Sequence, residues 1–336
     1  MFRRTTIAAI AIWLSVWALA PAASAEPVKE LNFGILSTES QQNLKSRFGR
    51  LLADMEQSLG MKVNAFFASD YAGVVEGMRF GKVQIAIYGN ASAIVAVDRA
   101  GGEVFGQVLQ EDGSDGYHSV IIVNKDSPIR DFEDLRRSAG KYSFSNGDPN
   151  STSGYLVPSY YAWALNNIDI RQHFTRVVSG NHEANALAVS ARQVDVATCN
   201  DEALRRLEAT QPERRAALRV IWTSPLIPHN PLVWRTDLPP ELKQKITAFL
   251  FDYGIARPDK PAAKLAEEQA ALAAMKTGSF RASSNKQLIP LRQITLFRER
   301  MTLEADDKVS AADKAAKLRE IDDKLQQLDR EVRLGS

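Results

Sequence analysis

The feature that most constrains the fold is the alternation of two apolar patterns in the first part of the chain. A short apolar run at 31–36 is followed by a stretch, 41–59, in which apolar residues recur at helical spacing. Further strand patterns lie at 63–68 and 83–88, with a helical pattern at 73–80 between them. Strands that alternate with helices are typical of a parallel sheet covered by helices. The chain should therefore begin with a β-α-β-α-β unit.

The alternation resumes further along the chain and predicts a second α/β lobe. Strand patterns lie at 119–124, 142–145, 175–178, 194–198, 220–223 and 231–234, and helical patterns at 154–166 and 241–253. We assign 26–118 and 227–300 to a discontinuous first lobe and 119–226 to a second lobe. Because the chain crosses twice between the lobes, we expect a hinged cleft, which is a preferred place for a ligand in α/β proteins.

The N-terminus has the pattern of a secretory signal peptide over residues 1–25. Arg3 and Arg4 precede an apolar run at 7–20 and the small residues Ala23-Ser24-Ala25. The run is shorter than the roughly 18 to 20 residues that span a bilayer. The one cysteine, Cys199, lies far from the cleavage point, so neither a lipid anchor nor an internal disulfide is expected. These features predict a soluble protein, free in the periplasm.

Charge gives no sign of a polyanionic partner. The chain has 42 Lys and Arg against 40 Asp and Glu, a formal net charge of +2, which suggests neither nucleic acid nor a membrane surface as a partner. The tail, 301–336, is rich in charge but has a narrow apolar stripe at Leu318, Ile321, Leu325, Leu328 and Val332. This stripe of a C-terminal helix packs on its own lobe or forms a homodimer contact, and the pattern favours neither.

The segment 146–154 combines several helix-capping residues where a strand pattern ends and a helical pattern begins. Ser151, Thr152 and Ser153 supply three hydroxyls, although one side chain is enough to cap a helix. A helix N-terminus also offers unpaired N–H groups and the positive end of the helix dipole, which suit a tetrahedral anion. Gly154 allows close approach to the backbone. The residues themselves favour anion binding and plain capping about equally.

Several stretches together resemble a known family. They are 31–35, Ser-Thr-Glu-Ser-Gln-Gln-Asn-Leu at 37–44, Asp-Tyr-Ala-Gly at 70–73, 88–90, 147–157, 182–187, 194–198, Ser-Pro-Leu-Ile-Pro at 224–228, and 280–284. With these the chain is similar, over nearly its whole mature length, to the phosphonate-binding periplasmic proteins of ABC importers. The resemblance implies a two-lobed, type II solute-binding protein. Each lobe would be a mixed sheet flanked by helices, with a ligand in the hinged cleft, no cofactor, and an inner-membrane ABC permease as partner.

The resemblance also implies a set of ligand-binding residues. Ser151, Thr152, Ser153 and His182 would hold the phosphonate, while Tyr71, Tyr117 and Glu202 would contact its organic end. Without the family, His182 is more often a structural histidine, the tyrosines are loop packing, and Glu202 is a solvated helix residue. A zinc site at His182-Glu183 is not expected, because no second histidine follows at the required spacing.

One position departs from the family pattern. Asn230 stands where the family has a second carboxylate for a ligand amine, and asparagine keeps an acceptor oxygen but has no charge. We therefore expect weaker preference for 2-aminoethylphosphonate, or preference for another alkylphosphonate. The alternatives are a carrier of phosphate or phosphite, a receptor for a membrane sensor, and an exported serine hydrolase. The last is disfavoured because no Gly-x-Ser-x-Gly motif is present, and no enzymatic activity is expected.

Overall fold

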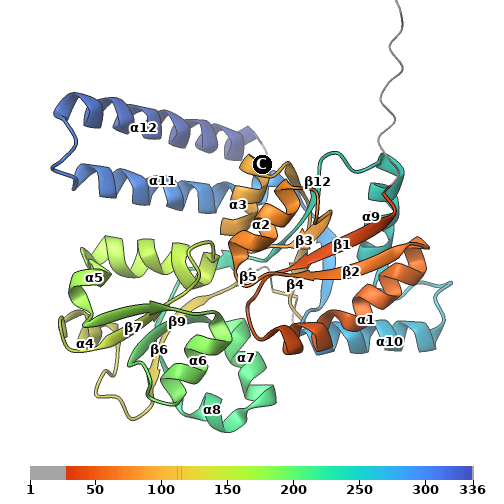
Figure 1. The fold of residues 1–336 in the computed structure, drawn as a ribbon, viewed down its shortest axis with the longest axis horizontal. Helices are drawn as coiled ribbons and strands as arrows, with labels where there is room; N and C mark the ends of the chain where they lie inside the picture. The colour runs from red at the N-terminus through yellow and green to blue at the C-terminus, as the bar shows by residue number, and fades with distance from the viewer. Residues whose placement is uncertain (1–27, 112, 115, 335–336) are drawn as a thin grey trace, which may run out of the picture.

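The computed structural model has two α/β lobes and a C-terminal pair of helices (Figure 1). It describes residues 28–111, 113–114 and 116–334. The signal peptide expected over 1–25 lies outside these residues. Within the described ranges, the helices are too short or too polar to cross a lipid bilayer.

The first lobe contains a six-stranded sheet in the order β13-β4-β12-β3-β1-β2. Its strands are β1 (Glu30–Ile35), β2 (Lys62–Phe67), β3 (Ile85–Ile87), β4 (Gly102–Leu109), β12 (Pro231–Arg235) and β13 (Ser279–Ala282). β1 pairs in parallel with β2 and β3, as the β-α-β-α-β pattern predicts. β12 runs antiparallel to β3 and β4, and β13 runs antiparallel to β4, so the complete sheet is mixed.

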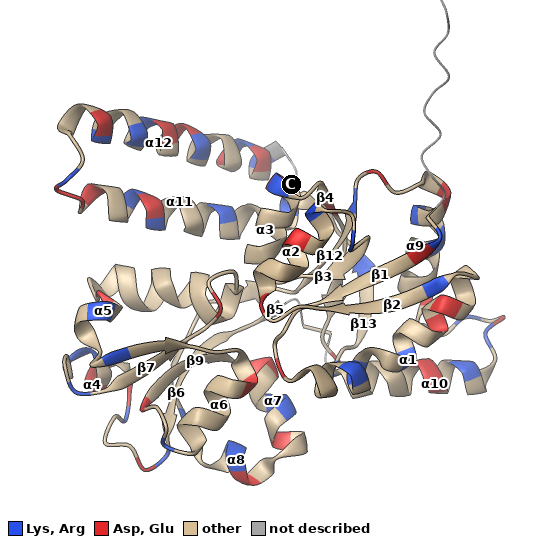
Figure 2. Ribbon diagram, in the orientation of Figure 1, with Lys and Arg blue, Asp and Glu red and all other residues tan. Residues whose placement is uncertain are grey.

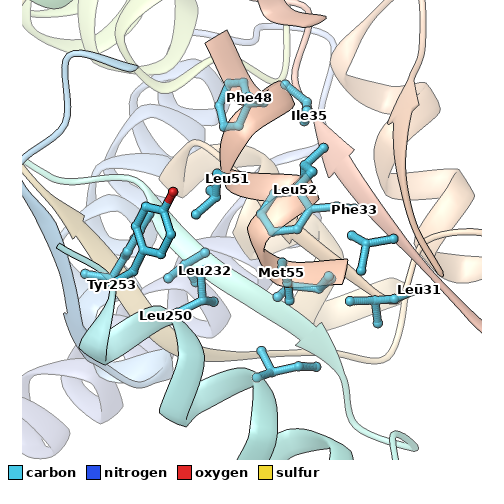
Figure 3. Close-up of a cluster of buried hydrophobic side chains, with 14 of the residues drawn as sticks. Leu31, Phe33, Ile35, Phe48, Leu51, Leu52, Met55, Leu232, Leu250 and Tyr253 are labelled. Carbon is cyan, nitrogen blue, oxygen red and sulfur yellow. The ribbon is translucent and has the colours of Figure 1, made fainter. Parts of the chain in front are cut away.

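Helices cover both faces of this sheet, which explains why its strands are apolar on both sides. They are α1 (Gln41–Leu59), α2 (Tyr71–Arg79), α3 (Asn90–Arg99), α9 (Pro240–Asp252) and α10 (Ala262–Met275). Leu31 and Phe33 point toward α1, α9 and α10 and form the core shown in Figure 3. Ala86 and Val233 point to the opposite face and pack against α2 and α3. The strand period of two thus divides one sheet between two cores.

The second lobe is built around a five-stranded sheet in the order β10-β6-β9-β7-β8. Its strands are β6 (Ser119–Asn124), β7 (Ser143–Asn146), β8 (Arg176–Ser179), β9 (Val196–Asn200) and β10 (Leu218–Thr223). Its α-helices are α4 (Phe132–Arg136), α5 (Ile170–His173), α6 (His182–Ser190), α7 (Asp201–Thr210) and α8 (Pro212–Ala216). β7, β8 and β9 begin one or two residues later than the patterns at 142–145, 175–178 and 194–198 predict.

The two connections between the lobes lie next to each other. One follows β4, the other follows β10, and they pair through two short antiparallel strands, β5 (Gly116–Tyr117) and β11 (Ile227–Pro228). A side chain at Gly116 would place its Cβ 2.3 Å from the carbonyl oxygen of Ile227, so this close approach requires glycine. Adjacent connections of this kind allow two lobes to rotate about one axis.

The C-terminal residues form two antiparallel helices, α11 (Ile289–Glu304) and α12 (Ala311–Leu334) (Figure 1). The apolar stripe of α12 packs against α11: Ile321 is buried, Leu318, Leu325 and Leu328 are partly buried, and Val332 is 50% exposed. Arg300 also pairs with Asp322 at 3.0 Å. Figure 2 shows that α12 carries charges of both signs along its length. The stripe is therefore covered by a helix of the same chain.

Candidate ligand-binding site

A cavity of about 90 Å³ lies between the lobes and is lined by residues from both. Its walls include the first residues of α2, α6 and α7, the residue before α3, and the start of a π-helix, η1 (Thr152–Leu156). Helix N-termini present unpaired N–H groups and a positive charge equivalent to roughly half a proton each. The cavity is lined by all the residues that the sequence singles out: Tyr71, Tyr117, Ser151, Thr152, Ser153, His182, Glu202 and Asn230.

The chain after Ser151 does not form the regular α-helix predicted over 154–166. It forms η1, a second π-helix, η2 (Ser159–Trp163), and a 3₁₀ turn, η3 (Ala164–Asn166). The reason lies in two carbonyls near its start. The Ser153 carbonyl accepts a hydrogen bond from the Ser119 hydroxyl at 2.6 Å, and the Gly154 carbonyl accepts one from the Thr198 hydroxyl at 2.7 Å. These buried bonds compete with the regular helical ones and fix the segment to the sheet.

The three hydroxyls at this helix start all use their oxygen to accept a hydrogen bond from the protein. Ser151, Thr152 and Ser153 are buried, and each hydroxyl oxygen accepts a hydrogen bond from the protein. The donors are the N–H groups of Gly154 and Ala91 and the side-chain amide of Asn200, at 2.9, 2.9 and 3.2 Å respectively. A hydroxyl has one proton to donate besides its acceptor sites. The same hydroxyls also hydrogen-bond the cavity tyrosines, Ser151 with Tyr71 and Thr152 and Ser153 with Tyr117. Because their oxygens already accept from the protein, their protons are the part that an anion in the cavity could bind.

His182 stands at the first position of α6, close to this group. Its Nε2 lies 3.4 Å from the Ser153 hydroxyl, and its buried Nδ1 has no hydrogen-bond partner among the described residues. Burial, and secondarily the charge of Arg206, lowers the pKa of His182 to about 3. The imidazole is therefore neutral at ordinary pH and has one N–H to donate.

The Ser153 and His182 pair lacks the geometry of a hydrolase. A catalytic histidine is oriented by an acceptor at its second ring nitrogen, and Nδ1 of His182 has none among the described residues. The described residues also contain no cluster of three or more His, Cys, Asp and Glu side chains that could hold a metal ion. The cavity is thus equipped to bind an anion through hydrogen-bond donors.

Two tyrosines form further walls of the cavity. Tyr71 opens α2, and its backbone N–H donates to Asp148 at 3.1 Å. Tyr117 belongs to β5 at the crossing between the lobes and stacks on His229, with 6.0 Å between the ring centroids. Burial is the main cause that raises the pKa of both tyrosines above the usual value. The charge of Asp148 raises the pKa of Tyr71 further, and the charge of Glu202 does the same for Tyr117. Both phenols therefore keep their protons and remain donors.

Glu202 and Asn230 face the same cavity but differ in charge. The carboxylate of Glu202 accepts a hydrogen bond from Gln110 at 2.6 Å and lies 3.8 Å from Nδ1 of His229. Burial lowers the pKa of His229, although Glu202 opposes that shift. Asn230 lies between β11 and β12, and its backbone carbonyl accepts from Val108 at 3.0 Å. Glu202 is thus the one carboxylate that lines the cavity among the described residues.

Three cationic residues, Arg47, Arg206 and Lys276, also line the cavity, and no sequence pattern singles them out. Arg47 lies in α1 next to the apolar stripe, at a position where a charged side chain is usually solvated. Its side chain is instead 18% exposed, and it pairs with Glu39 and donates to the Met275 carbonyl at 2.8 Å. Only the packing of the lobes brings these side chains together.

The chain matches the family described as "ABC transporter, phosphonate, periplasmic substrate-binding protein" over residues 33–288. It is 53% identical over 312 residues to the phosphonates-binding periplasmic protein of Escherichia coli, covering 93% of this chain and 89% of that protein.

Solved structures show the same fold. A binding protein component of an ABC phosphonate transporter from Pseudomonas aeruginosa is 50% identical, with a TM-score of 0.85 and coverage of 90% of this chain and 97% of that one. A protein from Prochlorococcus marinus, solved in complex with methylphosphonate, is 22% identical, with a TM-score of 0.69. The match covers 79% of this chain and 97% of that chain, and at this identity it supports the fold alone.

Proposed function

Because the chain belongs to the periplasmic substrate-binding proteins of phosphonate ABC transporters, we propose that its cleft binds an alkyl- or aminoalkylphosphonate for delivery to the inner-membrane permease. The family consists of binding components rather than enzymes, and it acts in the periplasm. The cleft between two hinged lobes is the place where such a ligand would be enclosed.

The proposal rests on the hydroxyls of Ser151, Thr152 and Ser153, whose oxygens all accept hydrogen bonds from the protein. Three buried O–H groups with engaged oxygens can donate to the three oxygens of one phosphonate. His182 and the start of η1 add further N–H groups. Hydrogen bonds to a charged group contribute about 1.5 to 3 kcal/mol each, and about 8 kcal/mol corresponds to micromolar affinity.

A ligand panel tests the proposal. Calorimetry with methylphosphonate, ethylphosphonate, 2-aminoethylphosphonate, phosphate and phosphite should give tightest binding to a phosphonate. Ser153→Ala should weaken that binding by about tenfold or more, since it removes one charge-assisted bond. Thr302→Val removes an exposed hydroxyl of α11 that bonds the Arg298 carbonyl and serves as a control. Tighter binding of phosphate or phosphite than of every phosphonate would contradict the proposal.

We further propose that residues 1–25 are cleaved on export. The mature protein should then begin at Glu26, which mass spectrometry of the periplasmic fraction would show.

For the oligomeric state we propose a monomer in place of a homodimer through the C-terminal helix, because the stripe of α12 already packs on α11. A dimer in sedimentation equilibrium would contradict this second proposal.

A further inference from the structure

A second cavity, of about 270 Å³, lies beside the first, between α1, α6, α7 and α10. The two cavities share four lining residues, Thr38, Arg47, Arg206 and Lys276. We call the last three of these the cationic junction. An organic group that extends from a phosphonate toward the second cavity would have to pass it.

One carboxylate, Glu39, forms the ion pairs of the cationic junction. Glu39 pairs with both arginines, with 3.6 Å to Arg206, so one carboxylate serves two guanidinium groups. The Lys276 ammonium has no ion partner among the described residues. The carboxylate of Glu183 accepts hydrogen bonds from the Ser40 N–H at 2.7 Å and the Asn43 amide at 2.8 Å. Arg47 and Arg206 therefore share one ion-paired carboxylate, and Lys276 stands beside them without an ion pair among the described residues.

Arg47 is the most constrained cation of the junction. Its buried Nε has no hydrogen-bond acceptor among the described residues. Burial, followed by repulsion from Arg206, lowers the pKa of Arg47. A buried guanidinium with a like charge beside it is stabilised when a carboxylate comes near, since it gains an opposite charge.

The opposite preference, for an amine, has little support in the same cavity. Glu202 is the one carboxylate that lines the first cavity among the described residues, and Asn230 offers an amide where a second carboxylate would be needed. A ligand ammonium would also meet three cations of like sign. Asparagine can instead donate its N–H groups to an anion.

We propose that the cleft prefers phosphonates whose organic tail ends in a carboxylate, and that the cationic junction binds this carboxylate. The inference rests on the proposed function, since it concerns the far end of the same ligand. Arg47 and Arg206 would contact the tail from opposite lobes, one from α1 and one from α7. Lys276, which occupies a left-handed conformation with φ 54° at the end of α10, would contact it from the mouth of the second cavity.

Calorimetry with tail-matched ligands tests the inference. 3-Phosphonopropionate carries the carboxylate, its primary amide is a neutral analogue of the same shape, 2-aminoethylphosphonate carries the opposite charge, and methylphosphonate has no tail. The carboxylate should bind about tenfold or more tightly than the amide, and the amine most weakly of the tailed ligands. Phosphonoacetate and 4-phosphonobutyrate would find the preferred length.

Variants assign the effect to the junction. Arg47→Gln should lower the affinity ratio of carboxylate to amide by about fivefold or more. Lys276→Gln, at an exposed position, should lower it by a smaller factor without affecting folding. Arg137→Gln, at the residue that follows the distant helix α4, is the control that should keep the ratio.

Tighter binding of 2-aminoethylphosphonate than of 3-phosphonopropionate would overturn the inference while leaving the proposed function intact. An unchanged ratio in both Arg47→Gln and Lys276→Gln would overturn the role of the junction. Absence of binding by every phosphonate, methylphosphonate included, would overturn the proposed function and this inference with it.

Discussion

The proposed phosphonate end and the proposed tail end of the cavity use different chemistry. The phosphonate end, formed by Ser151, Thr152, Ser153 and His182, is buried and made of neutral donors held by hydrogen bonds to the protein. The tail end, formed by Glu202, Asn230 and the cationic junction, contains opposite charges and, among the described residues, an arginine nitrogen without a hydrogen-bond partner. A preorganised set of neutral donors binds an anion of one geometry. On a charged surface, by contrast, a single substitution can change which ligand is preferred.

The largest effect should come from breaking the phosphonate end. Thr152→Val combined with Ser151→Ala removes two hydroxyls at once, so we expect affinity for methylphosphonate to fall by about a hundredfold or more. The loss should be the same for every tail, because both hydroxyls serve the shared phosphonate group. Calorimetry across the panel measures it. A loss confined to one tailed ligand would remove the distinction between the two ends.

The neutrality of the phosphonate end predicts a dependence of stability on pH. The pKa of His182 is lowered to about 3 in the folded protein, from 6.5. As pH falls below 6.5 the unfolded chain takes up a proton that the folded chain does not, so stability declines toward pH 3. Between pH 6.5 and 5 this histidine should account for about 2 kcal/mol.

Denaturant unfolding of the wild type and of His182→Gln over this pH range isolates that contribution. The variant should lose less stability on acidification than the wild type, because the glutamine does not titrate. Parallel pH profiles for the two proteins would show that His182 titrates normally, and the phosphonate end would then carry a charge.

A substitution at Asn230 sharpens the comparison from the tail end. Asn230→Asp places a second carboxylate near Glu202, which should raise affinity for 2-aminoethylphosphonate and lower it for 3-phosphonopropionate by about tenfold. Affinity for methylphosphonate should change much less, because this ligand has no tail. Equal changes for all three ligands in calorimetry would mean that Asn230 acts on the cleft as a whole.

The smallest effect concerns a contact between the lobes beside the second cavity. Glu183 of α6 accepts hydrogen bonds from Ser40 and Asn43 of the first lobe, so it helps to hold the lobes together. Glu183→Gln should weaken every ligand by the same small factor, about threefold to tenfold, since partly exposed charged bonds contribute little. Glu213→Gln on α8 is the matched control. A ligand-dependent effect would assign Glu183 to one end of the site.

Sequence patterns predict the elements of the fold better than their detailed winding. The apolar stripe of α1 places its helix at 41–59, because burial on one face dictates the period. The segment after Ser151 is helical in pattern yet forms π-turns. The hydroxyls that recruit its carbonyls, Ser119 and Thr198, come from strands distant in sequence. No local preference encodes such a competition.

The amino-acid sequence by itself determined the alternating α/β elements and the excess of hydroxyls at 151–153, because each depends on residue type and local spacing. The absence of a carboxylate at Asn230 became visible only through the resemblance to the family. Only the tertiary structure decided that Arg47, Arg206 and Lys276 meet at one junction, and that the hydroxyl protons are left to donate. Both depend on contacts between lobes, where burial and partner geometry set the energy of a charge or a hydrogen bond.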